Sequence, residues 1–186
     1  MDRHSALGGL PLRVDGVPHS IGSATTDPGD PMADAIITAT RDLAGDAFDV
    51  LRRSVDGLDA DALNRRPAGP DTNSIAVLAT HALGATRLLM SLAVGAPLPA
   101  RDRDAEFAAT ATGPDALLGA IDAIAAECLA ILDDAGEVDW GAPRRRTRSD
   151  GSVWEMTAGY ALLHALDHLR GHADEAALTR YVVTRS

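Results

Sequence analysis

The chain of 186 residues contains no lysine, only one cysteine and few aromatic residues. All 17 basic residues are arginine, which excludes chemistry that needs a lysine Schiff base. Cys128 has no partner for an internal disulfide, which agrees with a reducing, cytoplasmic location. The N-terminus lacks an apolar signal core, and no apolar run approaches the roughly 20 residues that span a membrane. We therefore expect neither secretion nor a membrane partner.

The composition favours helices over strands. Hydrophobic residues make up 46% of the chain but aromatic residues only 3%, and alanine and leucine dominate the apolar part. The formal net charge is -10. Because non-specific nucleic-acid binding depends on neutralising phosphates, this charge argues against a nucleic-acid partner. The length suits one domain with a tail.

Residues 1–31 are rich in Gly, Pro, Ser and Asp and show no helical pattern. We predict a flexible N-terminal tail there, followed by a single domain over residues 32–186. His4 and His19 lie in this tail and are expected to be solvated. Met32 opens the first helical segment and is a candidate alternative start. Native protein that begins at Met1, detected by mass spectrometry, would exclude that start.

Four segments show the apolar spacing of amphipathic helices. They run from about residue 33 to 55, from 72 or 73 to 95, from 114 to 136 and from 152 to 182. Without a strand pattern, they predict an all-α four-helix bundle. The link 58–72 contains Pro67 and Pro70, and no helix can run through it. The long link 95–113 allows a crossover between the second and third helices, which would place the second beside the fourth.

The fourth segment begins with Ser152 and Glu155, whose spacing is that of a capping box. The helix that follows is long, so we predict a break or bend near Ala173. Cys128 falls at an apolar position of the third helix and is expected in the core rather than as a nucleophile. The loop 137–151 carries four arginines, Arg144, Arg145, Arg146 and Arg148. Such a run is either a solvated loop or a site for an anionic substrate.

The fourth segment also carries His164, His168 and His172, each four residues from the next. On an α-helix this spacing places the three imidazoles in a column on one face. Two such histidines can hold a metal ion, but solvated or hydrogen-bonded histidines and a pH-sensitive face show the same spacing. His81, on the apolar side of the second helix, is a candidate third ligand. A lone histidine there is otherwise a satisfied core residue.

Two stretches of the chain resemble the DinB-like family of four-helix bundles. Residues 63–67 (LNRRP), 73–75 (NSI) and His81 resemble its pattern L-x-x-R-P, a short loop and S-I-x-x-L-x-x-H. The ending HALDHLRGHADEAALTR is similar to its last core helix. The resemblance covers about residues 33–182. It implies a four-helix bundle of unusual helix order, with a metal site that takes one histidine from the second helix and two from the last.

Carried onto this sequence, the resemblance implies His81, His168 and His172 as metal ligands, with His164 as the substitute. The ending LTR selects the alignment with the family's last helix in which His168 and His172 are the two ligands. In this alignment residues 174–175 (DE) stand where the family has Gly-His. Three neutral imidazoles leave open coordination positions, which is the layout of a catalytic site. Zinc, nickel and iron all accept imidazole, and the sequence does not choose among them.

The family includes mycothiol-dependent maleylpyruvate isomerases and thiol S-transferases. The resemblance therefore implies a metal-dependent enzyme in which a low-molecular-weight thiol attacks a small-molecule electrophile, by transfer or isomerisation, or a metal-dependent hydrolase. Asp167 and Glu175 are candidates to orient the ligands, and Arg66 either lines the pocket mouth or is solvated. The alternatives are a non-catalytic metal-binding or stress-response bundle, and a homodimer whose histidines only titrate.

Overall fold

The structure is a computed structural model that describes residues 31–148 and 151–185. The predicted tail, with His4 and His19, lies outside the described residues apart from Pro31, which begins the first helix. In chain order the elements are α1 (Pro31–Val55), α2 (Ala60–Asn64), α3 (Ile75–Val94), α4 (Arg103–Phe107), α5 (Pro114–Asp133), β1 (Pro143–Thr147), β2 (Val153–Thr157) and α6 (Ala158–Val183).

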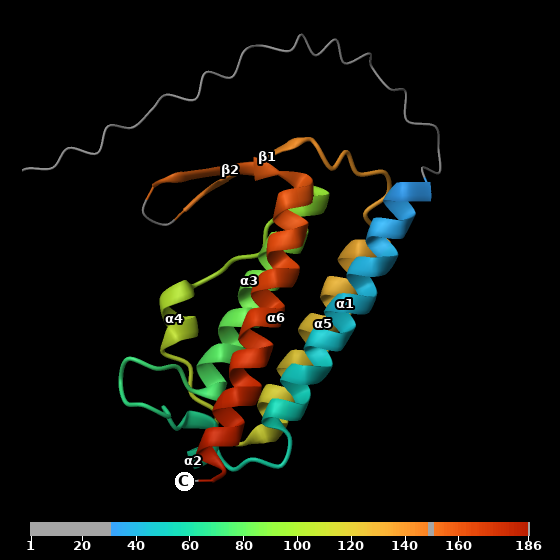
Figure 1. The fold of residues 1–186 in the computed structure, drawn as a ribbon. Helices are drawn as coiled ribbons and strands as arrows, with labels where there is room; N and C mark the ends of the chain where they lie inside the picture. Colours follow the sequence, from blue (N-terminus) through green and yellow to red (C-terminus); the bar gives the residue numbers. More distant parts are fainter. Residues whose placement is uncertain (1–30, 149–150, 186) are drawn as a thin grey trace, which may run out of the picture.

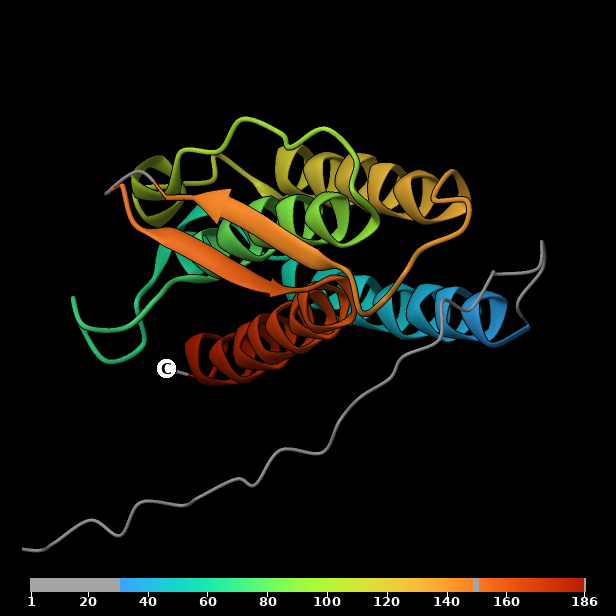
Figure 2. The same ribbon diagram turned by 90° about the horizontal axis from the view of Figure 1, so that it is seen from above.

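The four long helices form a bundle (Figures 1 and 2). Both α1 and α3 pack against α5 and α6, so α1 and α3 occupy opposite corners. The second long helix therefore lies beside the last one, as expected. In Figure 1, α3 and α5 run in the same direction, opposite to α1 and α6, and the link 95–113 returns along the side of the bundle. The all-α fold class is confirmed.

Helix α3 is the most deeply buried helix of the bundle. The Ser74 side chain caps its N-terminus by accepting a hydrogen bond from the backbone N–H of Val77, so the helix begins slightly later than predicted. Gly95 ends it in the left-handed conformation, with φ of 77°. By length and composition α3 could cross a membrane, but 83% of its apolar window is buried in the bundle. The expectation that no apolar run approaches spanning length was wrong here, because a fully packed core helix is apolar on all sides.

Two links contain one-turn helices that the sequence analysis did not predict. In the first link, Asp59 caps α2 by accepting from the N–H of Ala62, and the helix ends before Pro67. In the second, Asp102 caps α4 by accepting from the N–H of Ala105. Each helix has five residues, which is too short for an apolar stripe to appear in the sequence. In the sequence, these short helices are indicated by their N-cap aspartates rather than by apolar periodicity.

The segment predicted as a loop and helix start is an antiparallel hairpin of β1 and β2. Ser152 and Glu155 therefore do not form a helix cap, and Arg145 pairs with Glu155 across the strands. Polar side chains occupy both faces of β1, so the alternation that marks a strand is absent from its sequence. Helix α6 begins at Ala158 and continues to Val183 without interruption, so of the predicted break or bend near Ala173 the break is absent.

We expect Thr157→Ala to lower the free energy of unfolding by about 1 kcal/mol. The Thr157 hydroxyl accepts a hydrogen bond of 3.2 Å from the backbone N–H of Tyr160, and thereby caps α6. Urea denaturation followed by circular dichroism measures the change. Thr157→Ser keeps the hydroxyl and should stay near the parent value. An equal loss in the two variants would contradict the assignment of Thr157 as the cap.

Candidate metal centre

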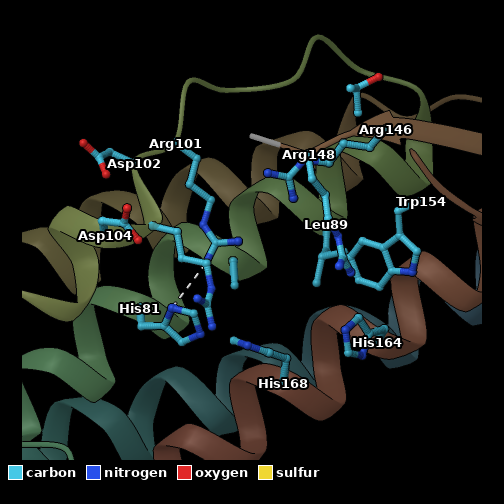
Figure 3. Close-up of a pocket in the computed structure, with 13 residues that line it drawn as sticks. His81, Leu89, Arg101, Asp102, Asp104, Arg146, Arg148, Trp154, His164 and His168 are labelled. Carbon is cyan, nitrogen blue, oxygen red and sulfur yellow. Dashed lines mark hydrogen bonds between the residues drawn. The ribbon is translucent and has the colours of Figure 1, made fainter. Parts of the chain in front are cut away.

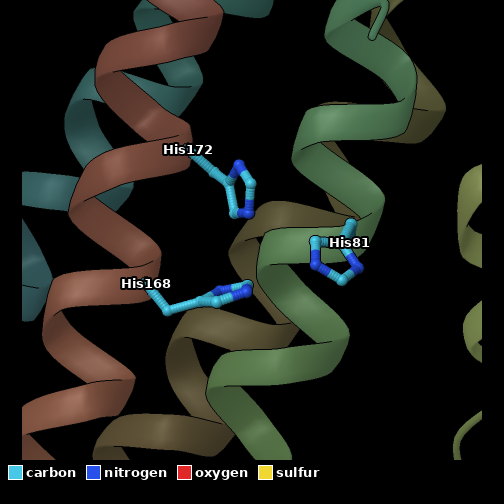
Figure 4. A group of neighbouring side chains, drawn as sticks. All are labelled: His81, His168 and His172. Carbon is cyan, nitrogen blue, oxygen red and sulfur yellow. The ribbon is translucent and has the colours of Figure 1, made fainter. Parts of the chain in front are cut away.

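Three histidines from two neighbouring helices face one another between α3 and α6 (Figure 4). His81 comes from α3, and His168 and His172 come from successive turns of α6. One donor nitrogen from each lies within 4.8 Å of the other two. Nitrogens that share one zinc ion lie roughly 3–4 Å apart, because each bond to the metal is about 2 Å long. Small side-chain rotations would therefore bring all three nitrogens onto one ion.

The packing of α6 explains why these side chains meet. The buried face of α6 consists mainly of alanines: Ala158, Ala161, Ala165, Ala173 and Ala176. Because the distance between packed helix axes depends on the side chains at the contact, small residues allow a close approach. His81 lies on the inward side of α3 and is only 5% exposed. Its ring centroid lies 5.0 Å from that of His168 and 5.1 Å from that of His172.

His81 is oriented by a buried carboxylate from the link between α3 and α5. Its Nδ1 lies 2.9 Å from Oε2 of Glu106. Arg101 donates to both oxygens of the same carboxylate, from Nε and Nη2, at 2.7 Å each. Burial alone would raise the pKa of Glu106, but the hydrogen bonds from His81 and Arg101 lower it below its usual value. The ionised carboxylate can only accept, so it favours the tautomer of His81 with the N–H at Nδ1, which leaves the lone pair of Nε2 for a ligand. Nη2 of Arg101 lies 3.2 Å from the same Nδ1.

Gly84 makes room for this carboxylate, one turn along α3 from His81. A Cβ atom at Gly84 would meet Oε1 of Glu106 at a distance that no real contact adopts. The glycine is helical and has no positive φ. Glycine is therefore needed here because it lets the Glu106 side chain approach the helix closely, and not because the backbone adopts an unusual conformation. The absence of a side chain at this position allows the link to place an acidic group against the imidazole.

His172 has a carboxylate partner of its own. Its Nδ1 lies 3.1 Å from Oε2 of Glu175, one turn further along α6. Glu175 was one of two predicted orienting residues, and the structure places it beside the ligand. Asp167, the other, has no hydrogen bond to a histidine among the described residues. Two of the three imidazoles thus have Nδ1 beside a carboxylate, an arrangement typical of metal-binding histidines.

His168 lies in the middle of the cluster. Its buried Nδ1 has no hydrogen-bond partner among the residues that the structure describes. Burial, followed by the neighbouring imidazoles of His172 and His81, lowers the pKa of His168 to about 3. The side chain is therefore neutral at pH 7, which is the form that binds metals. An unsatisfied buried nitrogen and two carboxylate-oriented imidazoles fit a divalent metal ion.

His164, the substitute ligand of the sequence analysis, lies outside this cluster. Its ring packs between Trp154 and Tyr160, with centroid distances of 5.5 and 5.8 Å. The His168 ring is 6.0 Å away. The structure thus brings together His81, His168 and His172, the preferred set. That these residues bind a metal stays a prediction.

A pocket of about 910 Å³ opens onto the cluster (Figure 3). Four parts of the chain form it: α3, the link 95–113, the hairpin strands with Arg148, and α6. The lining residues are His81, Ala85, Leu89, Arg101, Asp102, Arg103, Asp104, Arg146, Thr147, Arg148, Trp154, His164 and His168. Its volume is in the range of sites for small organic ligands. Arg66 does not line the pocket and instead donates to the carbonyls of Pro70 and Thr72.

The family model of the DinB superfamily matches residues 45–176. The chain belongs to the DinB superfamily. The resemblance carried by the two histidine motifs is thereby confirmed. A search of curated proteins finds no match to the chain.

A similar fold is found in a solved structure, the crystal structure of a conserved protein from Enterococcus faecalis. The two chains share 16% sequence identity and superpose with a TM-score of 0.63. The match covers 80% of this chain and 97% of the other. At this level of identity the likeness concerns the fold.

Three features of this DinB site were missed by the sequence analysis: Glu106, Arg101 and the hairpin. Both residues lie in the charged stretch RDRDAEF of the long link 95–113, to which the sequence analysis assigned only a crossover. The feature of the sequence that could have indicated the site is Glu106 followed by Phe107. Glu106 binds His81, and the Phe107 ring packs 4.4 Å from the same imidazole. Many exposed loops have the same composition, so sequence alone could not select this one.

We expect Gly84→Ala to weaken zinc binding by about tenfold to a hundredfold, as loss of an orienting carboxylate does. The added methyl group displaces the Glu106 carboxylate, which is the far end of a flexible side chain, so the bundle itself should still fold. Competition with a chromogenic chelator measures the affinity. Gly119→Ala on α5 is the control, because its Cβ would meet nothing within 4 Å. Equal zinc affinity in the two variants would contradict the orienting role of Glu106.

We expect the metal-free protein to lose stability as the pH falls below 6.5. In the unfolded chain His168 binds a proton below its ordinary pKa of 6.5, whereas the folded protein keeps it neutral down to about 3. The unfolded state therefore binds more protons, and stability is lost progressively across this window. Urea unfolding of chelator-treated protein between about pH 7.5 and about pH 5 measures the slope.

In the same experiment, the free energy of unfolding of His168→Asn should change less steeply with pH than that of the parent. The pH range of this experiment excludes the titration of Glu106. Because the pKa of Glu106 is lowered in the folded protein, its contribution to stability is lost only below the ordinary pKa of 4.5. Identical slopes for the parent and His168→Asn would contradict the prediction.

Proposed function

We propose that the protein is a divalent-metal-dependent enzyme that activates a low-molecular-weight thiol toward a small electrophile, by transfer or isomerisation. The observation that carries this proposal is the cluster of three imidazoles beside a pocket. A structural metal site is closed by four protein ligands, whereas three ligands leave a position for a reacting molecule. Two of these histidines, His81 and His168, line the pocket.

His81, His168 and His172 would hold the ion. Zinc, nickel and iron accept such ligands. When bound, the ion would lower the pKa of a coordinated thiol or water toward neutrality. The protein's own contribution is, first, to keep the His168 imidazole neutral and, second, to orient the imidazoles of His81 and His172. Burial keeps His168 neutral. Glu106 orients His81, and Glu175 orients His172.

The thiol in this proposal comes from outside the chain. Cys128 is fully buried on α5, and burial raises the pKa of its thiol to about 12. It stays protonated at neutral pH and is therefore a core residue rather than a nucleophile. A small external thiol agrees with the cytoplasmic location that we expect, and with the resemblance to thiol-dependent isomerases and S-transferases.

The first test is elemental analysis of full-length protein purified without an affinity tag. We expect about one equivalent of zinc, nickel or iron in the parent and a loss of most of it in His168→Ala. His164→Ala is the matched control, because His164 belongs to the same column but lies outside the cluster. A parent that holds no metal, even after dialysis against these ions, would overturn the proposal.

The second test is a thiol-dependent assay on the metal-loaded protein. Glutathione or cysteine and the alkylating reagent monochlorobimane give a fluorescent thioether, whose formation is followed directly. We expect a rate above that of the uncatalysed reaction and at least a tenfold decrease in His168→Ala, because removal of a ligand removes the ion. A metal-loaded protein without activity toward any such pair would favour the non-catalytic metal-binding alternative.

A further inference from the structure

We propose that this pocket binds the oxyanion of a small organic acid at Arg146, with Arg148 beside it. The substrate class of the enzyme is thereby an organic carboxylate or phosphate ester. As a statement about the substrate, this inference rests on the proposed function. As a statement about anion binding, it concerns the hairpin end of the pocket and does not require a metal.

The alternation of β1 separates the roles of its arginines. Arg145 is turned outward and pairs with the exposed Glu155. Arg144 is turned inward, where its Nε donates to the carbonyls of Leu92 and Ala93 at 3.0 and 3.1 Å. It thus stabilises the C-terminal end of α3, a position that favours cations. Arg146 shares the inward face of β1 but lines the pocket.

Arg146 lacks a carboxylate partner among the described residues. The nearby carboxylate of Glu106 is occupied, because it binds both Arg101 and His81. Burial lowers the pKa of Arg146, and the guanidinium groups of Arg101 and Arg148 lower it further. Arg146 thus lies at a partly buried position near two other guanidinium groups, and the carboxylate that acts on it, that of Glu106, is already paired with Arg101. An organic anion would supply the missing counter-charge and make charge-assisted hydrogen bonds.

The distribution of charge in the pocket differs between its two ends (Figure 3). Asp102 and Asp104 lie at the end beside α4, and Asp102 is already engaged as the N-cap of that helix. Arg146 and Arg148 lie at the other end, under the hairpin. Arg101 and Arg103 also line the pocket, so the end beside α4 carries both signs of charge. An anion would therefore be attracted to the hairpin end, where Arg146 and Arg148 lie. This polarity defines an orientation for a bound molecule.

The wall beside the arginines is apolar. Leu89 of α3 and Trp154 of β2 line the pocket there, and the guanidinium carbon of Arg148 lies 4.7 Å from the Trp154 ring centroid. A flat apolar body fits against this wall while its oxyanion binds the arginines. The volume of about 910 Å³ leaves space for a second small molecule near His81 and His168. The acid and a thiol could therefore occupy the pocket together.

The test compares benzoate and phenyl phosphate with benzamide, a neutral molecule of the shape of benzoate. Calorimetric titration is made on the full-length protein as purified and after chelator treatment, because a metal ion can itself bind carboxylates. Arg146→Gln is compared with Arg145→Gln, which removes the same charge from the opposite face of the same strand. Circular dichroism establishes that both variants are folded.

We expect the parent to bind at least one of the two anions, with benzamide at least tenfold weaker. Arg146→Gln should weaken anion binding by about tenfold to a hundredfold, as loss of a hydrogen bond to a charged group does. Arg145→Gln should leave it unchanged. The stronger of benzoate and phenyl phosphate identifies the oxyanion. Equal affinity for benzoate and benzamide, or equal effects of the two substitutions, would overturn the inference.

These outcomes are independent of those for the metal site. A protein without metal that still binds anions through Arg146 would overturn the proposed function and leave the anion site intact. A metal-loaded protein whose anion binding does not depend on Arg146 would overturn only the inference made here.

Discussion

Close packing between α3 and α6 is the constraint on which the site depends. The cluster needs one imidazole from α3 and two from α6, so the distance between these helices sets the distance between the donor nitrogens. Alanines on the buried face of α6 keep that distance short. A chain with few aromatic residues builds such a contact readily, because its core is filled by small side chains and leucine rather than by large rings. The small side chains that fill the core thus also set the short distance between the two helices that carry the histidines.

The buried carboxylate of Glu106 extends this constraint to the link between α3 and α5. A buried charge is tolerated only when its partners compensate for the lost hydration. Here Arg101 and His81 both bind it. Because Arg101 and Glu106 belong to the link while His81 belongs to the bundle core, the network attaches the pocket rim to the metal-binding face. Gly84 makes the attachment possible by leaving space on α3.

The hairpin gives the pocket its second kind of chemistry. Although the chain carries a formal net charge of -10, the hairpin directs Arg146 into a partly buried position above the histidines. An imidazole cluster at one place and a guanidinium group at another provide two different modes of recognition, coordination and charge pairing. Leu89 and Trp154 add an apolar wall to the same pocket. This combination distinguishes the pocket from a simple metal-binding groove.

The sequence by itself determined the helical class, the long helices and the column of three histidines on the last of them, because apolar spacing and i, i+4 columns are local properties of a helix. It also placed Cys128 in the core, since that position follows from the same helical geometry. It offered Asp167 and Glu175 as orienting residues, and the structure places Glu175 beside His172. The cap of α6 was assigned wrongly to Ser152. A three-residue spacing of Ser and Glu occurs in a hairpin as well as at a helix start.

Only the tertiary structure decided which histidines of the column meet His81, that Glu106 approaches through the gap at Gly84, and that Arg146 is turned inward while Arg145 is turned outward. These facts depend on contacts between segments far apart in the chain. Their residues carry no local pattern that separates them from ordinary charged loops. Local periodicity specifies which side of a helix is apolar, but the path of a link and the register of a hairpin are set by the packing of the whole bundle.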